Sequence, residues 1–216
     1  MQPKVSILTA SGGRPRQLEL CKRWVAHQTY DGPIEHIINE SDLNVPLNLA
    51  ECIKKATGDI CVVFEDDDFY PSKWVSICVF NLTEVTSFFG SSETIYYHLG
   101  AKRWREISHP GRSSLCATAW QAKHNDDVLS ICQGSTQFLD VDIWAWAQEN
   151  LSPWLIKDAY VKSLKGGPGR PGAGGGHKVH TYRDRDKIDT YDYPHLRCML
   201  GDEEARAYME ILDEED

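Results

Sequence analysis

The segment Val62 to Pro71 reads VVFEDDDFYP and closes a short apolar run with four consecutive carboxylates, Glu65 to Asp68. Like charges so close together repel one another and raise each other's pKa values, so we expect a cation beside them. The apolar run itself, Ile60 to Phe64 (ICVVF), is rich in β-branched residues and has the length of a buried strand. The segment therefore predicts a strand that ends in a strongly acidic turn.

The chain before this strand alternates strand and helix patterns. Val5 to Thr9 and Ile34 to Ile38 have the apolar character of buried strands. Each is followed by apolar residues at helical spacing, over Arg16 to Gln28 and over Leu47 to Ala56. This alternation predicts an α/β fold with a mostly parallel sheet, and such sheets bind ligands outside the carboxyl ends of their strands. The acidic run lies at such an end.

The chain after the acidic run predicts a more mixed arrangement. Pro71 is expected to begin a helix. Three shorter strands, at Ile95 to Tyr97, Trp104 to Ile107 and Leu115 to Trp120, are expected to form a small antiparallel extension of the sheet. Asp142 to Gln148 (DIWAWAQ) is expected to be a helix.

Two later segments differ in composition from the rest. The stretch GGPGRPGAGGGH, which begins at Gly166, holds seven glycines and two prolines, so residues 166–176 are expected to form a mobile loop. Asp202 to Leu212 has the pattern of a short acidic helix. We therefore expect one domain over residues 1–200 and a solvated acidic tail over residues 201–216.

The composition suits a soluble folded domain, with 41% hydrophobic and 25% charged residues in 216. Seven cysteines without a CxxC pair favour free thiols in a reducing compartment. The N-terminus, MQPKVSILTA, lacks the pattern of a signal peptide or membrane span, so we expect a cytoplasmic protein with no membrane partner.

The net charge of −9 is unevenly distributed. Asp202 to Asp216 holds eight acids against one arginine, whereas Lys102 to Lys123 carries five basic residues against one glutamate and Lys157 to Lys187 carries eight against three aspartates. A polyanionic partner therefore stays possible.

Two interpretations of the acidic run are open. It can be a solvated turn whose last carboxylate caps the following helix. It can also be a site for Mg²⁺ or Mn²⁺, which prefer hard oxygen ligands and are commonly held by one or two carboxylates plus substrate phosphates. Such an ion would keep several carboxylates ionised together.

Two stretches, VSILTASGGRPRQLELCKRWVAHQTY and AECIKKATGDICVVFEDDDFYPSKWV, together resemble the opening of family 2 glycosyltransferases of the GT-A fold. The similarity covers roughly the first 75 residues and includes the family's strand, polar turn with Arg-Pro, helix, and acidic Asp-x-Asp motif. It implies a single Rossmann-like GT-A domain, with residues 1–100 as the nucleotide-sugar-binding half and residues 101–200 as the acceptor and catalytic half. It also implies a metal-dependent, inverting transferase that uses a UDP-linked sugar as donor.

The resemblance assigns roles within the acidic run and around it. Asp66 and Asp68, with Asp67 between them, would handle the metal and the donor diphosphate. In a register shifted by one residue, Glu65 would face the ribose and Asp67 would bind the metal. The turn from Thr9 to Arg14 would border the nucleotide base. The remaining donor candidates are Ser11 within that turn and, after the second strand, Glu40 and Asp42, where the family usually has an aspartate directly after the strand.

A second stretch of similarity lies at Leu139 to Ala147, LDVDIWAWA. Asp140 falls on the family's catalytic aspartate, which takes the proton from the acceptor hydroxyl, although Leu139 replaces the usual Glu. The alternative is that Asp140 caps the helix, with Asp142 competing for either role. Gly134 resembles the family's small-residue loop beneath the sugar.

GT-A enzymes often supply a late histidine as a further metal ligand, which makes His177 and His180 candidates. Arg183 and its basic neighbours could clamp the departing diphosphate. A glycine-rich loop closing over the donor would exclude water.

The acceptor is open. One candidate is a hydroxymethylated base in DNA, as in sugar-transferring enzymes of some bacterial viruses, with Trp104 and Trp120 stacking on bases; in that case the protein works in the host cytoplasm. A small molecule or a glycan is the alternative. A nucleotidyltransferase acting on a sugar phosphate, and a non-catalytic module that only binds nucleotide sugars, are the other two functions that this sequence allows.

Overall fold

A central sheet of six strands in the order β2-β1-β3-β7-β4-β8 organises the protein. The computed structural model describes residues 2–135, 138–167, 186–190 and 192–213. The strands of this sheet are β1 (Val5–Ser11), β2 (Ile34–Glu40), β3 (Ile60–Val63), β4 (Phe88–Ser91), β7 (Thr118–Gln121) and β8 (Trp154–Ile156).

The first three strands are parallel, as the sequence predicts. Val5 of β1 pairs with Ile34 of β2 and with Ile60 of β3. The helices between them are α1 (Pro15–Ala26) and α2 (Val45–Lys55). β1 continues two residues beyond its predicted end, because Ser11 still pairs with Glu40.

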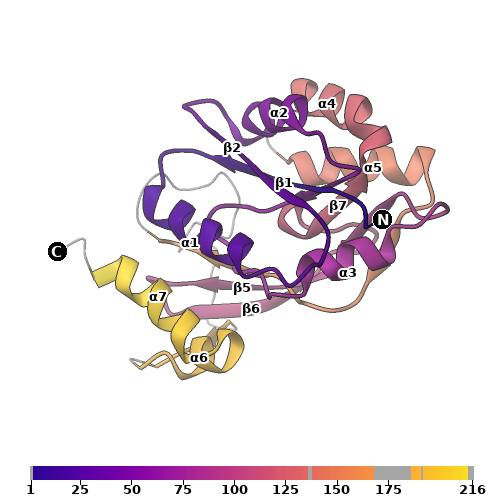
Figure 1. Cartoon of the computed structure of the whole chain (residues 1–216). Helices are drawn as coiled ribbons and strands as arrows, with labels where there is room; N and C mark the ends of the chain where they lie inside the picture. Colours follow the sequence, from indigo (N-terminus) through magenta and orange to yellow (C-terminus); the bar gives the residue numbers. More distant parts are fainter. Residues whose placement is uncertain (1, 136–137, 168–185, 191, 214–216) are drawn as a thin grey trace.

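Each face of the central sheet carries its own apolar layer, since side chains alternate along a strand. Val5, Ile7 and Val62 pack with residues of α1 and of α3 (Trp74–Asn81). Leu8 and Val63 point the other way, toward α2, α4 (Asn125–Gly134) and α5 (Leu139–Asn150). Figure 1 shows α2, α4 and α5 gathered on one side of the sheet. The fold is therefore a helix–sheet–helix sandwich, a Rossmann-like α/β arrangement.

The expected antiparallel extension is only partly correct. β7 does join the central sheet, antiparallel to β3, but the first half of its predicted range is a 3₁₀ helix, η1 (Leu115–Ala117). The other two strands belong to a second sheet in the order β10-β6-β5-β9. Its strands are β5 (Glu93–His98), β6 (Arg103–Ser108), β9 (Lys162–Lys165) and β10 (Lys187–Ile188). A second 3₁₀ helix, η2 (Ala122–His124), follows β7.

The starts of α3 and α5 each differ from the prediction by three residues. Pro71 does not begin α3; its carbonyl accepts a hydrogen bond from the Trp74 amide at 3.0 Å, in a turn that precedes the helix. The helix predicted at Asp142 to Gln148 is present and longer, as α5.

The acidic C-terminal helix is packed against the domain and is not a solvated tail. After α6 (Pro194–Leu200), α7 (Asp202–Asp213) buries Ala205 and Tyr208 while Asp202, Glu203 and Glu210 are exposed. Tyr208 stacks on Trp24 of α1, with ring centroids 6.0 Å apart, and accepts a hydrogen bond from Trp24 Nε1 at 2.9 Å. The apolar residues recur at helical spacing and so form one buried face.

Of the helices in the described ranges, none combines the length and the apolar character that crossing a membrane requires.

Candidate active site

The acidic turn, Glu65 to Asp68, follows β3 at the carboxyl edge of the parallel strands. Phe64 and Tyr70 flank the turn, and their rings stack with centroids 3.7 Å apart. The Glu65 amide also donates a hydrogen bond to Tyr70 Oη at 2.7 Å. Asp66 and Asp68 have fully buried side chains, whereas the Glu65 side chain is 28% exposed. The residue before α3, Lys73, makes no side-chain cap, and Asp68 bonds elsewhere. The solvated, helix-capping interpretation is therefore wrong.

Arg14 neutralises one side of the turn. It follows β1, and its guanidinium forms an ion pair with Asp66 and donates to Asp67 Oδ2 at 2.8 Å. Ser11 Oγ donates to Asp66 Oδ2 at 2.8 Å. The end of β1 and the turn after it thus fix the position of Asp66. The planar guanidinium of Arg14 presents several N–H donors at once, which suits binding to carboxylates.

Lys165 neutralises the other side. The backbones of Phe69 and Lys162 exchange hydrogen bonds of 2.9 and 3.1 Å, which place β9 beside the acidic turn. Lys165 Nζ then lies 2.8 Å from Asp68 Oδ1, 3.3 Å from Asp67 and 3.9 Å from Glu65. Lys165 is 6% exposed.

Asp68 also accepts hydrogen bonds from the Leu164 amide at 3.0 Å and from Ser163 Oγ at 3.2 Å. Strand β9 therefore holds this carboxylate through three consecutive residues.

Burial shifts the pKa values of the charged groups in the turn. Among the described residues, the cations Arg14 and Lys165 face its four carboxylates. Burial raises the pKa of Asp66 to about 6 although Arg14 opposes the rise. Burial likewise raises the pKa values of Glu65 and Asp68 against the effect of Lys165. The pKa of Lys165 is itself raised: burial would lower it, but Asp67, Asp68 and Glu65 outweigh burial.

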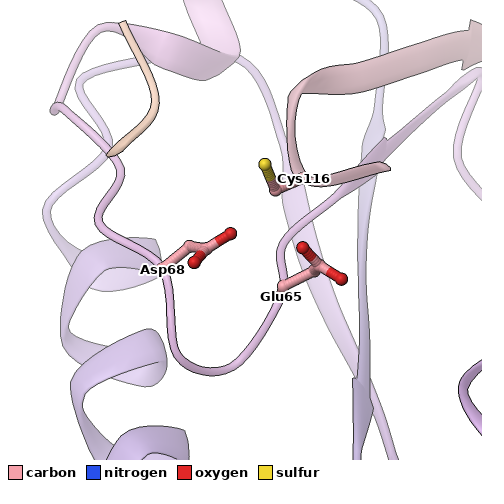
Figure 2. Close-up of side chains that lie close together, drawn as sticks. All are labelled: Glu65, Asp68 and Cys116. Atoms are coloured by element: carbon pink, nitrogen blue, oxygen red, sulfur yellow. The ribbon is translucent and has the colours of Figure 1, made fainter. Parts of the chain in front are cut away.

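A divalent cation fits this donor set. Figure 2 shows Glu65, Asp68 and Cys116 close together, and one ligand atom of each lies within 4.8 Å of the others. Carboxylate oxygens suit Mn²⁺ or Mg²⁺, which prefer hard oxygen ligands. Burial raises the pKa of the Cys116 thiol well above its usual value, so this group stays protonated and is a poor ligand.

The carboxylate pair differs from the expected one. Asp68 lies close to Glu65 and Cys116, whereas Asp66 accepts hydrogen bonds from Arg14 and Ser11.

The other donor candidates lie in different environments. Thr9 is wholly buried, with its hydroxyl 2.9 Å from His36 Nε2, so it cannot border a base as expected. Ser11 is also buried, and its hydroxyl donates a hydrogen bond to Asp66. Glu40 and Asp42 are exposed at the carboxyl end of β2, the edge where donor contacts are expected. Gly134 is the last residue of α4. A Cβ at this position would have no atom within 4 Å among the described residues, so the packing there does not require glycine.

Asp140 lies in the first turn of α5, paired with Arg112 and with its side chain 21% exposed. It is not the capping residue, since the N-cap is Phe138. One turn further on, Trp144 Nε1 donates to Thr118 Oγ1 at 3.0 Å. Thr118 begins β7, and because β7 runs antiparallel to β3, this beginning lies at the carboxyl end of β3. The start of α5 and the acidic turn therefore share one edge of the sheet.

Neither tryptophan proposed to bind the acceptor offers a free stacking platform. Trp120 is fully buried, stacked on Phe88, and donates to Asn125 Oδ1 at 2.9 Å, so that expectation is wrong. β7 lies between two other strands, which puts this ring in the core. Trp104 stacks on His195 at 3.5 Å and has Lys187 Nζ 4.1 Å from its ring centroid.

Three expected residues, His177, His180 and Arg183, lie outside the described residues, as does the glycine-rich loop from residue 168 onward. Two residues of the site were not expected, Lys165 and Arg112. The pattern VKSLK directly before two glycines is the signal that marks Lys165 as a cation at a strand end. Arg112 lies in a polar turn without a comparable signal.

Protein-family models give no match to this chain, and neither do curated proteins. Solved structures do match. S. aureus TarS aligns with 9% identity and a TM-score of 0.53, over 74% of this chain and 36% of its own. A structure of TarS 1-349 in complex with UDP aligns with 9% identity and a TM-score of 0.51, over 74% of this chain and 60% of that one. The mannosyltransferase PcManGT from Pyrobaculum calidifontis, in complex with GDP-Man and Mn²⁺, aligns with 13% identity and a TM-score of 0.52, over 97% of this chain and 70% of its own.

The aligned part thus spans less than two thirds of these TarS chains. At such identities the likeness concerns the fold. This chain has the GT-A-like fold of glycosyltransferases.

Proposed function

We propose that this chain is a glycosyltransferase that moves a sugar from a nucleoside-diphosphate sugar, with UDP as the nucleotide, to an acceptor hydroxyl with inversion. The observation that carries the proposal is the shared edge of the sheet. There, a buried acidic turn with two cations and a partly exposed Asp140 lie within one GT-A-like domain. The complexes of the structural neighbours with UDP and with GDP-Man and Mn²⁺ support this choice of donor class.

The acidic turn would bind the donor through its charge. Glu65 and Asp68 would hold Mn²⁺ or Mg²⁺, which when bound supplies positive charge against the donor diphosphate. Arg14 keeps Asp66 and Asp67 in place, so the turn stays ordered before the donor arrives. Glu65, the most exposed of the four carboxylates, is the one that a ligand would meet first.

Asp140 would act as the general base. As the acceptor oxygen forms its bond to the anomeric carbon, its proton passes to Asp140 and the bond from that carbon to the diphosphate breaks, releasing UDP. Inversion follows because the acceptor attacks from the face opposite the leaving group. Arg112 pairs with Asp140 and would hold its carboxylate at this edge of the sheet.

For the acceptor, the narrower proposal is a hydroxymethylated base in DNA. Its support is the net positive charge of Lys102 to Lys123, and the buried Trp120 no longer contributes to it. Binding to duplex DNA that weakens as salt concentration rises is expected. Salt-independent binding would instead favour a small molecule or glycan.

The test is a panel of sugar nucleotides with Mn²⁺, scored for released products. We expect release of UDP from one UDP-sugar, faster with an acceptor than without. Release of pyrophosphate from a nucleoside triphosphate and a sugar phosphate would identify a nucleotidyltransferase instead. Saturable donor binding without release of UDP, with hydroxymethylated DNA, sugars and glycans as acceptors, would identify a binding module.

A further inference from the structure

Lys165 has its ammonium group inside the acidic turn, where a divalent cation would bind. Its Nζ lies 2.8 Å from Asp68 and 3.9 Å from Glu65, and these two residues are the carboxylates that lie close together in Figure 2. An ammonium and a divalent cation repel each other and cannot both occupy the same carboxylate oxygens.

The backbone of Lys165 is fixed, and its side chain reaches three carboxylates of the turn. Lys165 pairs with His98 across β9 and β5. Gly166, directly after it, has φ +74, and a Cβ there would lie 2.0–2.5 Å from the His98 ring atoms. This packing anchors the end of β9. The ammonium itself sits on a four-carbon stem and can swing without moving the strand.

Arg14 differs from Lys165 in this respect. Its guanidinium contacts both Asp66 and Asp67 in a forked arrangement, and neither of those residues belongs to the pair of Glu65 and Asp68. Arg14 can therefore stay paired with Asp66 and Asp67 whether or not a metal ion is bound.

We propose that Lys165 is an internal counter-cation that competes with the divalent metal for Glu65 and Asp68. This inference rests on the proposed function, since it describes how that same site is kept before the donor binds. Without nucleotide, Lys165 holds the carboxylates and metal binding is weak. A bound diphosphate adds negative charge, which gives the ammonium a second partner and favours the metal. Nucleotide and metal therefore bind cooperatively, and each raises the affinity for the other.

The first test measures Mn²⁺ binding without nucleotide, from the electron paramagnetic resonance signal of free Mn²⁺. We expect Lys165→Met to bind Mn²⁺ at least tenfold more tightly than the unaltered chain. Lys165→Arg, which keeps the charge, is expected to show no gain. Lys162→Met is the matched control on the same strand, because Lys162 Nζ bonds to the Ala159 carbonyl and not to the turn. A dissociation constant for Lys165→Met within twofold of the unaltered chain, or weaker, overturns the inference.

The second test adds UDP and separates this inference from the proposed function. UDP is expected to tighten Mn²⁺ binding more in the unaltered chain than in Lys165→Met. If UDP binds to neither protein while Lys165→Met still gains Mn²⁺ affinity, the competition stands and the proposed function fails. If UDP binds but the two proteins hold Mn²⁺ equally well, the proposed function stands and the competition is refuted.

Removing a buried cation can also destabilise the fold, because it leaves carboxylates without their partner. Thermal unfolding with and without Mn²⁺ keeps the test decisive in that case. The melting temperature of Lys165→Met is expected to rise more with Mn²⁺ than that of the unaltered chain. Equal rises would contradict the proposal.

Discussion

Asp140 and the carboxylates of the acidic turn differ in what holds them. Asp66 and Asp68 are buried and receive several hydrogen bonds each, so their positions are set by the fold. Asp140 keeps part of its side chain exposed and pairs with Arg112. A partly exposed carboxylate near a binding edge can accept a proton, whereas the buried ones serve to shape the site.

The residue-scale prediction concerns Asp140. Asp140→Asn keeps the shape but cannot accept a proton, so we expect turnover to fall by roughly 10²- to 10⁴-fold. UDP affinity is expected to stay within twofold, since Asp140 does not belong to the acidic turn. Steady-state release of UDP and calorimetric binding of UDP measure the two effects.

Asp142→Asn is the matched control, because Asp142 lies exposed in the same helical turn. Turnover by Asp140→Asn above a third of the original value would rule out a general base here. Joint loss of turnover and of UDP binding would place Asp140 in the donor site.

At the scale of single residues, the sequence identifies charge but not accessibility. The acidic run stands out as four consecutive carboxylates after a strand, whereas Arg14 and Asp140 stand out through the family resemblance. Thr9 and Trp120 were misjudged because burial depends on neighbouring strands that local patterns do not reveal. Lys165 reaches the acidic turn only through the bridge between Phe69 and Lys162, which are far apart in the chain.

At the scale of elements, Glu35 joins the edge strand to its neighbours. It lies on β2, and its carboxylate accepts hydrogen bonds from Ser6 Oγ on β1 at 2.6 Å and from the Thr57 amide before β3 at 2.7 Å. Lys4 Nζ pairs with it at 2.6 Å. Burial would raise the pKa of Glu35, but these donors outweigh burial and lower the value from 4.5 to about 2.

The pH dependence follows from the direction of this shift. Because the folded-state pKa lies below the unfolded value, Glu35 stabilises the fold above pH 4.5 and loses this contribution as the pH falls toward 2. Glu35→Gln is expected to lower the free energy of unfolding by about 1–2 kcal/mol at pH 7. The difference between the two proteins should shrink as the pH falls toward 3, measured by urea unfolding at each pH.

Glu51→Gln is the control for Glu35, since Glu51 pairs only with Lys54 on the surface of α2. A difference between Glu35→Gln and the original chain that stays constant from pH 7 to pH 3 would refute this role of the carboxylate.

The elements that were predicted well share a local signal. The run β1-α1-β2-α2-β3 follows from hydrophobic periodicity, and β2 and β3 both pair with β1. The second sheet could not be predicted in this way. β5 pairs with β9 in parallel, more than sixty residues later in the chain, and no local pattern specifies such a partner.

At the scale of the whole molecule, α7 packs against α1 and covers its buried side chains. Trp24 is 1% exposed, and its Nε1 donates to Tyr208 Oη. Tyr208→Phe removes this acceptor and leaves a buried donor unsatisfied. We expect the free energy of unfolding to fall by about 1–3 kcal/mol, measured by urea denaturation. Tyr160→Phe, at a ring that is 37% exposed, should have little effect. Equal stabilities of the two variants would mean that α7 does not depend on this contact.

The central claim concerns the acidic turn at the edge of the sheet. We propose that this turn binds a nucleoside diphosphate together with a divalent cation. The most direct measurement is a crystal structure of the chain with UDP and Mn²⁺, using the anomalous signal of manganese. We predict a manganese peak in contact with the carboxylates of Glu65 and Asp68, bridged to the UDP diphosphate, with the Lys165 ammonium moved away from both. A manganese peak elsewhere on the molecule, or UDP bound away from the carboxyl end of β3, would contradict the account.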